Sequence, residues 1–283
     1  MKPIIKYRGG KSKELNNFLQ YVPDDFERYV EPFAGGAALY FHLEPSRALI
    51  NDINTRLIDF YISVRDNYDV LKKELTSLEK VYSANQHEYT LLKNEVSTNS
   101  FIENKNEDLY YSLRDMYNGK VEKEYIDATL YYFINKTSYS GMLRFNSKGE
   151  FNVPFGRYKN FNTSFVSKEH SSLLEGAEIT NVDYSKVFDV CSANDFIFLD
   201  PPYDCIFTDY GNTEQNDFSE EKHIKLSQDF RNLNARTLMI IGETELTERL
   251  YRPYIKARYF KKYSVNIRNR FKAESTHLII TNY

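Results

Sequence analysis

Short apolar runs that stop at an acid or a turn recur along the chain, and amphipathic helical patterns lie between them. The strand-like runs cover residues 28–30, 48–50, 179–182, 196–199 and 238–241, and the helical patterns cover 13–20, 37–43, 54–64, 219–233 and 246–254. Strands that alternate with helices at this spacing form βαβ units. The pattern therefore predicts an α/β fold built on a largely parallel sheet.

Two more β-rich runs, residues 259–267 and 277–281, close the chain, and we expect them to pair antiparallel at one edge of the sheet. The alternation of strand and helix patterns is interrupted over residues 65–165. That stretch contains three helical patterns, a polar loop and a hairpin turn, at residues 70–82, 87–96, 122–135, 97–106 and 147–149 respectively. We therefore predict an α/β domain of residues 1–64 and 166–283 that is interrupted by an insertion of residues 65–165.

Composition narrows the class of protein. A hydrophobic content of 41% supports a sizeable core, and aromatic residues make up 16% of the chain. The two cysteines, Cys191 and Cys205, form no disulfide framework, and the histidines show no metal-ligand spacing, so we expect no metal. The first residues lack a signal-peptide core, and no run is apolar for the roughly 18 residues of a membrane span. The sequence thus predicts a cytoplasmic protein with no membrane partner.

Charge is distributed unevenly along the chain. The net charge of −3 argues mildly against a nucleic-acid partner. However, residues 2–13 carry five basic side chains before their first acid, Glu14, and residues 252–272 carry basic side chains without any acid. Basic stretches of this kind can form a face that contacts phosphates, although each stretch alone is also typical of solvated surface.

The segment 196–203 reads Phe-Ile-Phe-Leu-Asp-Pro-Pro-Tyr and carries the strongest functional signal. A buried strand at the carboxyl edge of a sheet would end at Asp200, where open α/β sheets bind ligands. Asp200 and the Pro201 carbonyl can accept the two N–H bonds of an amino group, and Tyr203 can stack on a flat ring. The alternative is an Asp-Pro-Pro turn that closes an ordinary buried strand.

Residues 31–38 read Glu-Pro-Phe-Ala-Gly-Gly-Ala-Ala and follow the first predicted strand of the sheet. The glycines allow a tight turn into a helix and close approach to a ligand. Asp52 follows about twenty residues later, at a position that suits a ribose diol. The segment is not G-x-G-x-x-G, so the pattern favours a nucleoside cofactor without a pyrophosphate, with a simple helix-entry turn as the alternative.

Residues 139–159 interleave basic and aromatic side chains. The basic members are Arg144, Lys148, Arg157 and Lys159, and the aromatic members are Tyr139, Phe145, Phe151, Phe155 and Tyr158. This mixture suits phosphate contacts, base stacking and readout of guanine by arginine. A β-hairpin with one hydrophobic face would show the same composition. The N-terminal loop 6–11 is basic and glycine-hinged, but its spacing is not that of a Walker A motif.

Taken in order, these motifs resemble the Dam-like DNA adenine-N6 methyltransferases of the alpha group, or D12 class. The matching stretches are residues 6–11, 29–39, 51–53, 135–159, 200–203 and 278–283. They frame almost the whole chain, and only the region around 65–125 matches poorly. The resemblance implies that residues 1–64 and 166–283 form a Rossmann-like catalytic domain for S-adenosylmethionine. It also implies that residues 65–165 form a target-recognition domain with a DNA-reading hairpin at 139–162.

The resemblance also assigns residues. Its catalytic positions fall on Asp200, Pro201, Pro202 and Tyr203. Its cofactor positions fall on Tyr7, Lys11, Asp52 and Asp200, with Glu31, Phe33, Gly35, Asp183 and Tyr184 completing the pocket. Its DNA-binding positions fall on Lys11, Tyr139, Ser140, Met142, Arg144, Pro154 and Tyr158. Family members that read GATC commonly carry Asn where this chain has Ser140, so we expect a recognition sequence other than GATC.

The activity that follows is transfer of a methyl group from S-adenosylmethionine to N6 of an adenine flipped out of duplex DNA. A covalent nucleophile is not needed, and neither cysteine follows a proline as a cytosine-C5 enzyme would require. Two alternatives stay open: a methyltransferase of another amino or amide nitrogen, in protein glutamine or RNA, and a DNA-binding relative without activity. The expected partner is double-stranded DNA. A cognate restriction endonuclease would form no stable complex, and the oligomeric state is left open.

Overall fold

The computed structural model describes residues 1–95, 102–203, 218–262 and 274–283. These residues form two compact units. The α/β unit consists of Lys11–Asn54 and Gly176–Tyr283, and the helical unit consists of Met1–Gly10 and Thr55–Glu175. No helix in the described part of the chain is long and apolar enough to cross a membrane.

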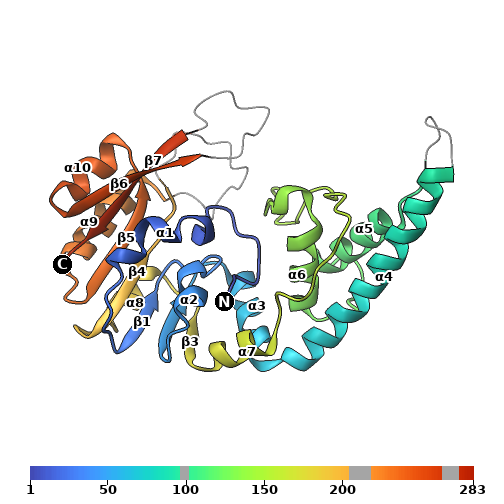
Figure 1. The fold of residues 1–283 in the computed structure, drawn as a ribbon, viewed down its shortest axis with the longest axis horizontal. Helices are drawn as coiled ribbons and strands as arrows, with labels where there is room; N and C mark the ends of the chain where they lie inside the picture. Colours follow the sequence, from blue (N-terminus) through green and yellow to red (C-terminus); the bar gives the residue numbers. More distant parts are fainter. Residues whose placement is uncertain (96–101, 204–217, 263–273) are drawn as a thin grey trace. The chain divides into compact units, whose positions relative to one another are not determined.

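A seven-stranded sheet forms the centre of the α/β unit, with the strand order β3-β2-β1-β4-β5-β7-β6 (Figure 1). The strands are β1 (Arg28–Glu31), β2 (Ala48–Asn51), β3 (Ala177–Thr180), β4 (Asp195–Leu199), β5 (Arg236–Gly242), β6 (Ile255–Lys262) and β7 (Glu274–Thr281). The first five strands in this order are parallel, and β7 runs antiparallel to both β5 and β6. The predicted α/β fold and the antiparallel edge are therefore confirmed.

Short helices connect these strands. They are η1 (Lys11–Lys13), α1 (Leu15–Phe18), η2 (Leu19–Tyr21), α2 (Ala38–Leu43), α8 (Tyr184–Phe188), α9 (Glu220–Asn232), α10 (Glu245–Tyr251) and η4 (Arg252–Tyr254). The larger ones begin at polar caps: Ser219 accepts a hydrogen bond from a backbone N–H at the start of α9, and Thr244 forms a capping box with Thr247 at the start of α10. These caps satisfy backbone donors that the first helical turn leaves unpaired.

Two predicted strands are displaced from their expected positions. The run expected at 179–182 forms β3 at Ala177–Thr180, because its pairing with β2 begins at Ala48 and ends at Asn51. The run expected at 259–267 begins earlier, at Ile255, and residues 263–267 lie outside the described part of the chain. Ile255 pairs with Ile280, so the antiparallel partner β7 extends the strand further than its local pattern indicates.

The order of the strands brings two loops to one edge of the sheet. β1 and β4 are parallel neighbours, with Val30 opposite Ile197, and the strand order changes direction between them. Every residue of β4 is buried, so the strand lies in the core of the α/β unit. In open α/β sheets such a reversal opens a crevice at the carboxyl ends of the strands. The loops after Glu31 and Leu199 both leave from this edge.

The helical unit is built from α3 (Thr55–Asp66), α4 (Tyr68–Glu95), α5 (Lys105–Tyr117), α6 (Asp127–Thr137), η3 (Tyr139–Gly141) and α7 (Lys168–Glu175). One continuous α4 replaces the two helices that the sequence predicts at 70–82 and 87–96. The intervening residues, Ser-Ala-Asn-Gln, contain neither glycine nor proline, so nothing ends the helix there. Helices α5 and α7 were not predicted, although the buried residues Tyr110, Leu113 and Tyr117 of α5 follow helical spacing.

The first ten residues pack with α6. The Asn135 side chain accepts a hydrogen bond from Lys6 N at 2.9 Å and donates one to Lys6 O at 2.7 Å. Lys136 Nζ donates to the Ile4 carbonyl at 2.6 Å. In addition, α3 packs against α7. The helical unit therefore extends beyond the insertion expected at 65–165, because long-range contacts recruit Met1–Gly10, α3 and α7 into it.

The segment expected to form a hairpin turns back on itself without regular strands. A single antiparallel bridge joins Phe145 to Phe151, and a second joins Ser138 to Phe155. Asn146 closes the turn, because its side-chain oxygen accepts backbone hydrogen bonds from Lys148 and Glu150 at 3.0 Å each. Side-chain hydrogen bonds of this kind replace a strand ladder where the loop is short and polar.

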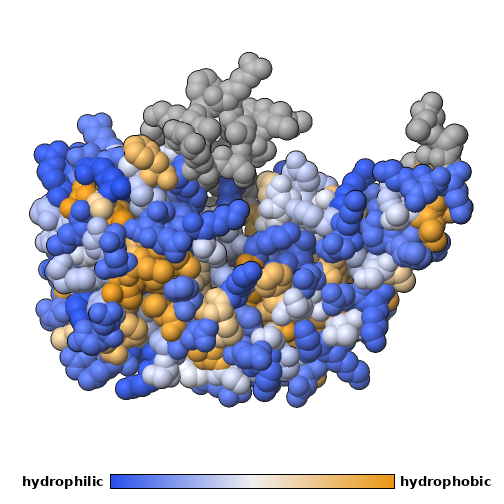
Figure 2. Space-filling model, in the orientation of Figure 1, coloured by the Kyte–Doolittle hydropathy of each residue, from blue (hydrophilic) through white to orange (hydrophobic). Residues whose placement is uncertain are grey.

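Most of the surface visible in Figure 2 over the described residues is hydrophilic. Large apolar side chains are nevertheless exposed at a few positions, and two of them, Ile53 and Phe260, lie in the α/β unit. Ile53, directly after Asp52, is 60% exposed, and Phe260 on β6 is 79% exposed. Single exposed apolar residues are common, so only their neighbours can give them meaning.

Candidate active site

A buried ion pair lies where β4 ends. Asp200 is the first residue after the strand, and Lys11 belongs to η1. Lys11 Nζ lies 2.6 Å from Asp200 Oδ1 and 2.7 Å from Asp200 Oδ2, so it contacts both carboxylate oxygens. The Lys11 side chain is only 2% exposed, whereas the Asp200 side chain keeps 20% exposure. The Asp200 carboxyl is therefore fixed by Lys11 and remains partly accessible to solvent.

The charges in this pair depend on each other. Burial raises the pKa of Asp200 above its ordinary value, and the positive charge and hydrogen bonds of Lys11 act against that rise. Without a neighbouring cation, a buried carboxyl tends to take up a proton and lose its capacity as an acceptor-only group. The contact with Lys11 therefore favours the ionised form of Asp200.

Tyr203 lies beside the same pair. Its ring centroid is 5.0 Å from Lys11 Nζ and 5.1 Å from the His277 ring, to which it is nearly perpendicular at 87°. The ring also lies on Gly242 at the end of β5, where a Cβ atom would be only 3.3 Å from Tyr203 Cδ2. Between Asp200 and Tyr203, Pro201 is buried and Pro202 is exposed. The four predicted catalytic positions, Asp200–Tyr203, directly follow β4 at the carboxyl edge of the sheet.

The glycine-containing loop after β1 is tied to the end of β2. Gly35, with φ of +48°, donates its N–H to Asp52 Oδ2 at 2.8 Å, and Asn54 donates its N–H to Asp52 Oδ1 at 2.9 Å. Asp52 is 8% exposed, and burial raises its pKa while the two backbone N–H groups oppose the rise. The predicted cofactor residues Gly35 and Asp52 are therefore in direct contact.

Glu31, the last residue of β1, lies at the same edge. It is 2% exposed and accepts a hydrogen bond from Tyr29 Oη at 2.9 Å. Desolvation raises the pKa of Glu31 well above its ordinary value, and the negative charges of Asp200 and Asp52 raise it further. The carboxyl groups of Asp200 and Asp52 therefore act on Glu31 at one edge of the sheet.

Asn51, which the sequence did not single out as a site residue, holds the loops around Asp52. Its side-chain nitrogen donates to the carbonyls of Pro32 and Val182 at 3.0 Å each, and its oxygen accepts from Val182 N at 2.9 Å. A polar residue at the last position of a fully buried strand is the signal that could have identified it.

Aromatic residues cover the side of the site near β3. The Phe33 and Tyr184 rings lie 5.2 Å apart, and Tyr184 Oη donates to Asp229 Oδ2 at 3.0 Å. Asp183 is the N-cap of α8, where its carboxylate accepts hydrogen bonds from Ser185 N at 3.0 Å and from the Ser185 hydroxyl at 2.6 Å. Asp183 therefore serves as a helix cap, next to the aromatic pair.

Tyr7 and the predicted DNA-binding residues other than Lys11 belong to the helical unit. Tyr7 accepts a hydrogen bond from Gly10 N at 3.1 Å through its carbonyl. Tyr139 is 53% exposed, and Ser140 is exposed in a left-handed backbone conformation with φ of 55°. Pro154 is exposed, and its carbonyl accepts a hydrogen bond from Tyr139 N at 2.9 Å, which joins the two ends of the loop.

Arg144 is exposed but held in place. Its Nε donates to Asn152 Oδ1 at 2.8 Å, and its Nη2 donates to the Asn152 carbonyl at 3.2 Å. Met142 lies partly buried two residues before it. An arginine whose guanidinium is oriented in advance loses less conformational entropy when it binds a partner.

Lys6 is a second residue that the sequence analysis placed in a motif without assigning it a role. Its Nζ lies 4.1 Å from the centroid of the Tyr158 ring, and its side chain lies against Gly141, where a Cβ atom would be 3.1 Å from Lys6 Cδ. Burial lowers the pKa of Lys6. Lys6, Gly141 and Tyr158 therefore bring together two stretches of sequence, residues 6–11 and 135–159.

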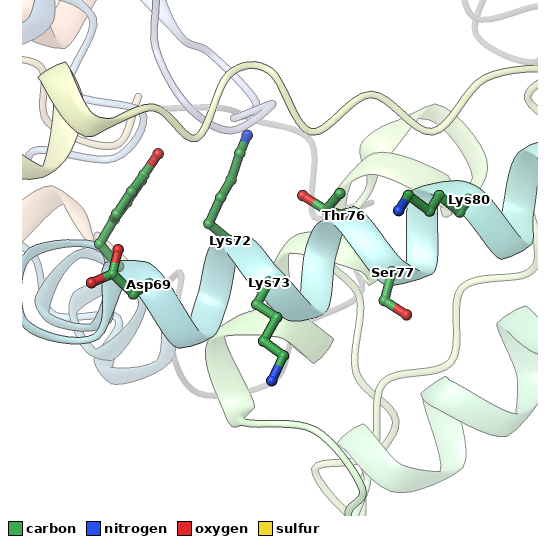
Figure 3. Close-up of a pocket in the computed structure, with 7 residues that line it drawn as sticks. Asp69, Lys72, Lys73, Thr76, Ser77 and Lys80 are labelled. Carbon is green, nitrogen blue, oxygen red and sulfur yellow. The ribbon is translucent and has the colours of Figure 1, made fainter.

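A shallow hollow on α4 is unrelated to these residues. Figure 3 shows Lys72, Lys73 and Lys80 along it, and none of its lining residues belongs to the α/β unit. Lys72 Nζ donates to the carbonyls of Thr163 at 2.9 Å and Val166 at 2.8 Å, so its charge serves the packing of α4. This hollow does not carry the chemistry of the site.

Comparison with known proteins agrees with the geometry. A family model described as D12 class N6 adenine-specific DNA methyltransferase matches residues 7–268. The chain is 34% identical over 296 residues to Type II methyltransferase M.CviBI of Paramecium bursaria Chlorella virus NC1A, with 100% of both chains covered. It is 24% identical over 260 residues to a DNA adenine methylase of Haemophilus influenzae, covering 88% of this chain and 82% of that relative.

The Lys11–Asp200 pair predicts a pH-dependent stability. Lys11→Met should lower the melting temperature at pH 8, because removing one partner of a buried pair costs up to about 3–5 kcal/mol, reduced here by the remaining exposure of Asp200. The raised pKa of Asp200 means that the folded chain holds this proton more tightly than the unfolded chain. The deficit should therefore shrink as the pH is lowered from 8 to 5 and Asp200 takes up its proton.

Thermal denaturation across this pH range measures the effect, with Lys13→Met as the control, since Lys13 is exposed. A deficit that stays constant or grows at low pH would contradict the role assigned to Lys11.

Proposed function

The chain belongs to the D12 class N6 adenine-specific DNA methyltransferases, and from this premise we propose how its own residues bind and orient the target base. It is an enzyme that methylates N6 of adenine in DNA, with the Rossmann-like fold of its family. The observation that carries the proposal is the continuous segment Asp200–Tyr203 at the carboxyl edge, with Asp200 held as a carboxylate by Lys11.

Asp200 and the Pro201 carbonyl accept the two N–H bonds of the adenine amino group. Each carboxylate oxygen has two lone pairs, so Asp200 can accept one of these hydrogen bonds while Lys11 Nζ keeps its contacts at 2.6 and 2.7 Å. Two fixed acceptors turn the amino group so that the nitrogen lone pair faces the methyl donor. They also stabilise the positive charge that develops on nitrogen, and such preorganised acceptors contribute much of an enzyme's rate enhancement.

Tyr203 provides the surface on which the flipped adenine stacks. Gly242 and His277 support one side of the ring, so the ring is held in place before the base arrives. Stacking of a base on an aromatic side chain contributes about 1–3 kcal/mol. This energy helps to offset the cost of removing the base from the duplex.

We propose S-adenosylmethionine as the methyl donor, bound along the edge formed by Glu31, Gly35 and Asp52. The residues fit this group: Asp52 has acceptor capacity beyond its two backbone hydrogen bonds, and exposed Ile53 offers an apolar contact beside it. Phe33 and Tyr184 supply aromatic surface on the same loops, with Asp183 at the start of α8. When bound, this donor supplies a methyl group that its sulfonium makes electrophilic. Lys11 and Tyr7 are also proposed as cofactor-binding residues.

For the helical unit we propose target recognition in duplex DNA. Tyr139, Ser140, Met142, Arg144, Pro154 and Tyr158 lie on one turned-back segment that side-chain hydrogen bonds hold in shape. Exposed arginine beside aromatic rings suits base and phosphate contacts. The α/β unit would then act as the catalytic domain. A cognate restriction endonuclease is a further proposal that rests on the Type II names of relatives such as M.CviBI.

The two alternative activities are less well supported. A methyltransferase of protein glutamine or RNA would share Asp200–Tyr203, but the family match and the named relatives are DNA methyltransferases. An inactive DNA-binding relative would not need the Lys11–Asp200 pair, in which a costly buried charge is kept ionised at the sheet edge.

Asp200→Ala is expected to abolish methylation of DNA and, because it removes the carboxylate from buried Lys11, also to lower the melting temperature. Asp200→Asn should keep a trace of turnover, because the amide oxygen can still accept one hydrogen bond. Transfer of labelled methyl groups to DNA, together with thermal denaturation, measures both effects. Asp189→Ala is the control, since its carboxyl is exposed. Near-normal turnover in Asp200→Ala would show that the catalytic assignment is wrong.

Asp52→Asn is expected to weaken binding of S-adenosylmethionine more than binding of DNA. The lost carboxylate–diol contact costs on the order of 1.5–3 kcal/mol, which is roughly ten- to a hundred-fold in affinity. The amide oxygen can accept from only one of the Gly35 and Asn54 N–H groups, so thermal denaturation must show separately that the loop stays folded. Titration calorimetry with the cofactor checks this prediction, and unchanged affinity would exclude the ribose role.

Arg144→Ala is expected to relax discrimination at one base pair, because a bidentate arginine–guanine contact discriminates by about 1–3 kcal/mol. Lys148→Ala, an exposed change in the same turn, should instead weaken all sequences alike. Methylation rates on the cognate site and on singly substituted sites distinguish the two. A uniform loss in Arg144→Ala with a smaller salt dependence would show a phosphate contact. Because Ser140 replaces the usual Asn, exclusive methylation of GATC would also contradict our expectation.

A further inference from the structure

Behind Tyr203, three neighbouring strands present a row of residues in register. Gly242 of β5 is opposite His277 of β7, and His277 is opposite Tyr259 of β6. Tyr203 lies on the first two members of this row: its ring is against Gly242 and edge-on to His277, and its Oη lies 3.5 Å from His277 Nδ1. The antiparallel edge of the sheet therefore forms the wall that supports the proposed stacking ring.

Glu14, from the segment that also carries Lys11, covers this row. Its Oε2 accepts a hydrogen bond from Tyr259 Oη at 2.8 Å and lies 3.0 Å from His277 Nδ1, and its Oε1 contacts Lys261 Nζ. The Glu14 side chain is 6% exposed and His277 is fully buried. Although burial acts to raise the pKa of Glu14, hydrogen bonds from His277 and Lys261 lower it to about 2.

These contacts determine the state of His277. An ionised carboxylate only accepts hydrogen bonds, so the Nδ1 atom that faces Glu14 must carry a proton. Tyr259 Oη lies 3.1 Å from the same nitrogen and already donates to Glu14, so its oxygen can only accept there. Glu14 and Tyr259 thus hold the imidazole in one tautomer and one ring orientation, nearly perpendicular to the Tyr203 ring.

We infer that Glu14, His277 and Tyr259 are positioning residues that fix the Tyr203 ring where the target adenine stacks. The inference rests on the stacking role proposed for Tyr203. A connected buried network holds a side chain more rigidly than a single contact does. A displacement of about 1 Å at a reacting centre can cost roughly a hundred-fold in rate, so the orientation of the ring matters as much as its presence. None of the three residues touches the base itself.

The test uses the full chain and compares His277→Phe, which keeps a ring without the N–H group, with His277→Asn, whose amide N–H can replace Nδ1–H. His277→Phe should lower kcat on duplex DNA roughly ten- to a hundred-fold with affinity for S-adenosylmethionine unchanged. DNA with 2-aminopurine at the target position should fluoresce more strongly in this complex than in the wild-type complex, because the flipped base stacks less well. His277→Asn should restore most of both properties.

A double-mutant cycle locates the effect. In a Tyr203→Ala background, His277→Phe should cause no further loss of kcat if the network acts through Tyr203. An equal loss in both backgrounds would overturn the inference. Tyr259→Phe, which removes only a hydroxyl, should give a smaller change in the same direction and serves as the second variant if His277→Phe fails to fold. Arg258→Gln is the control on the same strand, since Arg258 pairs instead with Glu243 and Glu248.

The outcomes separate this inference from the proposed function. If Tyr203→Ala itself has normal turnover and normal 2-aminopurine fluorescence, the stacking role of Tyr203 is wrong. If Tyr203→Ala is impaired while His277→Phe and Tyr259→Phe match the wild-type kcat and fluorescence, the stacking role stands and the positioning network is refuted.

Discussion

The candidate active site at the carboxyl edge of the sheet depends on the contact between Lys11 and Asp200. A carboxyl at the end of a fully buried strand has an unfavourable environment for its charge, and burial raises its pKa. The ammonium group at 2.6 Å compensates for this cost, but only if η1 is held beside β4. Glu14, directly after η1, anchors the same segment to β6 and β7. The N-terminal part of the α/β unit is therefore an integral part of the site.

The sheet turns this electrostatic requirement into geometry. Because β1 and β4 are parallel neighbours at the point where the strand order reverses, their two loops leave from the same edge. Asn51 and Asp52 then connect the loop after β1 to β2 and to the segment before α8. The side chains of Asn51 and Asp52 form hydrogen bonds with backbone groups of these segments. Other side chains at this edge can therefore bind ligands.

In the helical unit, side-chain hydrogen bonds also hold a loop, with fewer regular elements around it. Its turned-back segment has only isolated bridges among the described residues, yet Asn146 and Asn152 hold it through hydrogen bonds to the backbone and to Arg144. Such loops can vary in sequence while the helices beneath them are retained, which is the arrangement expected where a protein must recognise a particular ligand. Ser140 in this segment is exposed and has a left-handed backbone conformation.

The sequence by itself determined the class of fold and located the strand that leads into the Asp200–Tyr203 motif, because these depend on local apolar runs and on short motifs. Residues near one another in the chain leave a periodic pattern, and a carboxyl after a buried strand can be recognised without coordinates. Only the tertiary structure revealed that Glu14, Tyr259 and His277 meet behind Tyr203 and that Met1–Gly10 packs with α6. Most of these contacts join segments far apart in the chain, and strand register, which local pattern does not specify, decides which side chains meet.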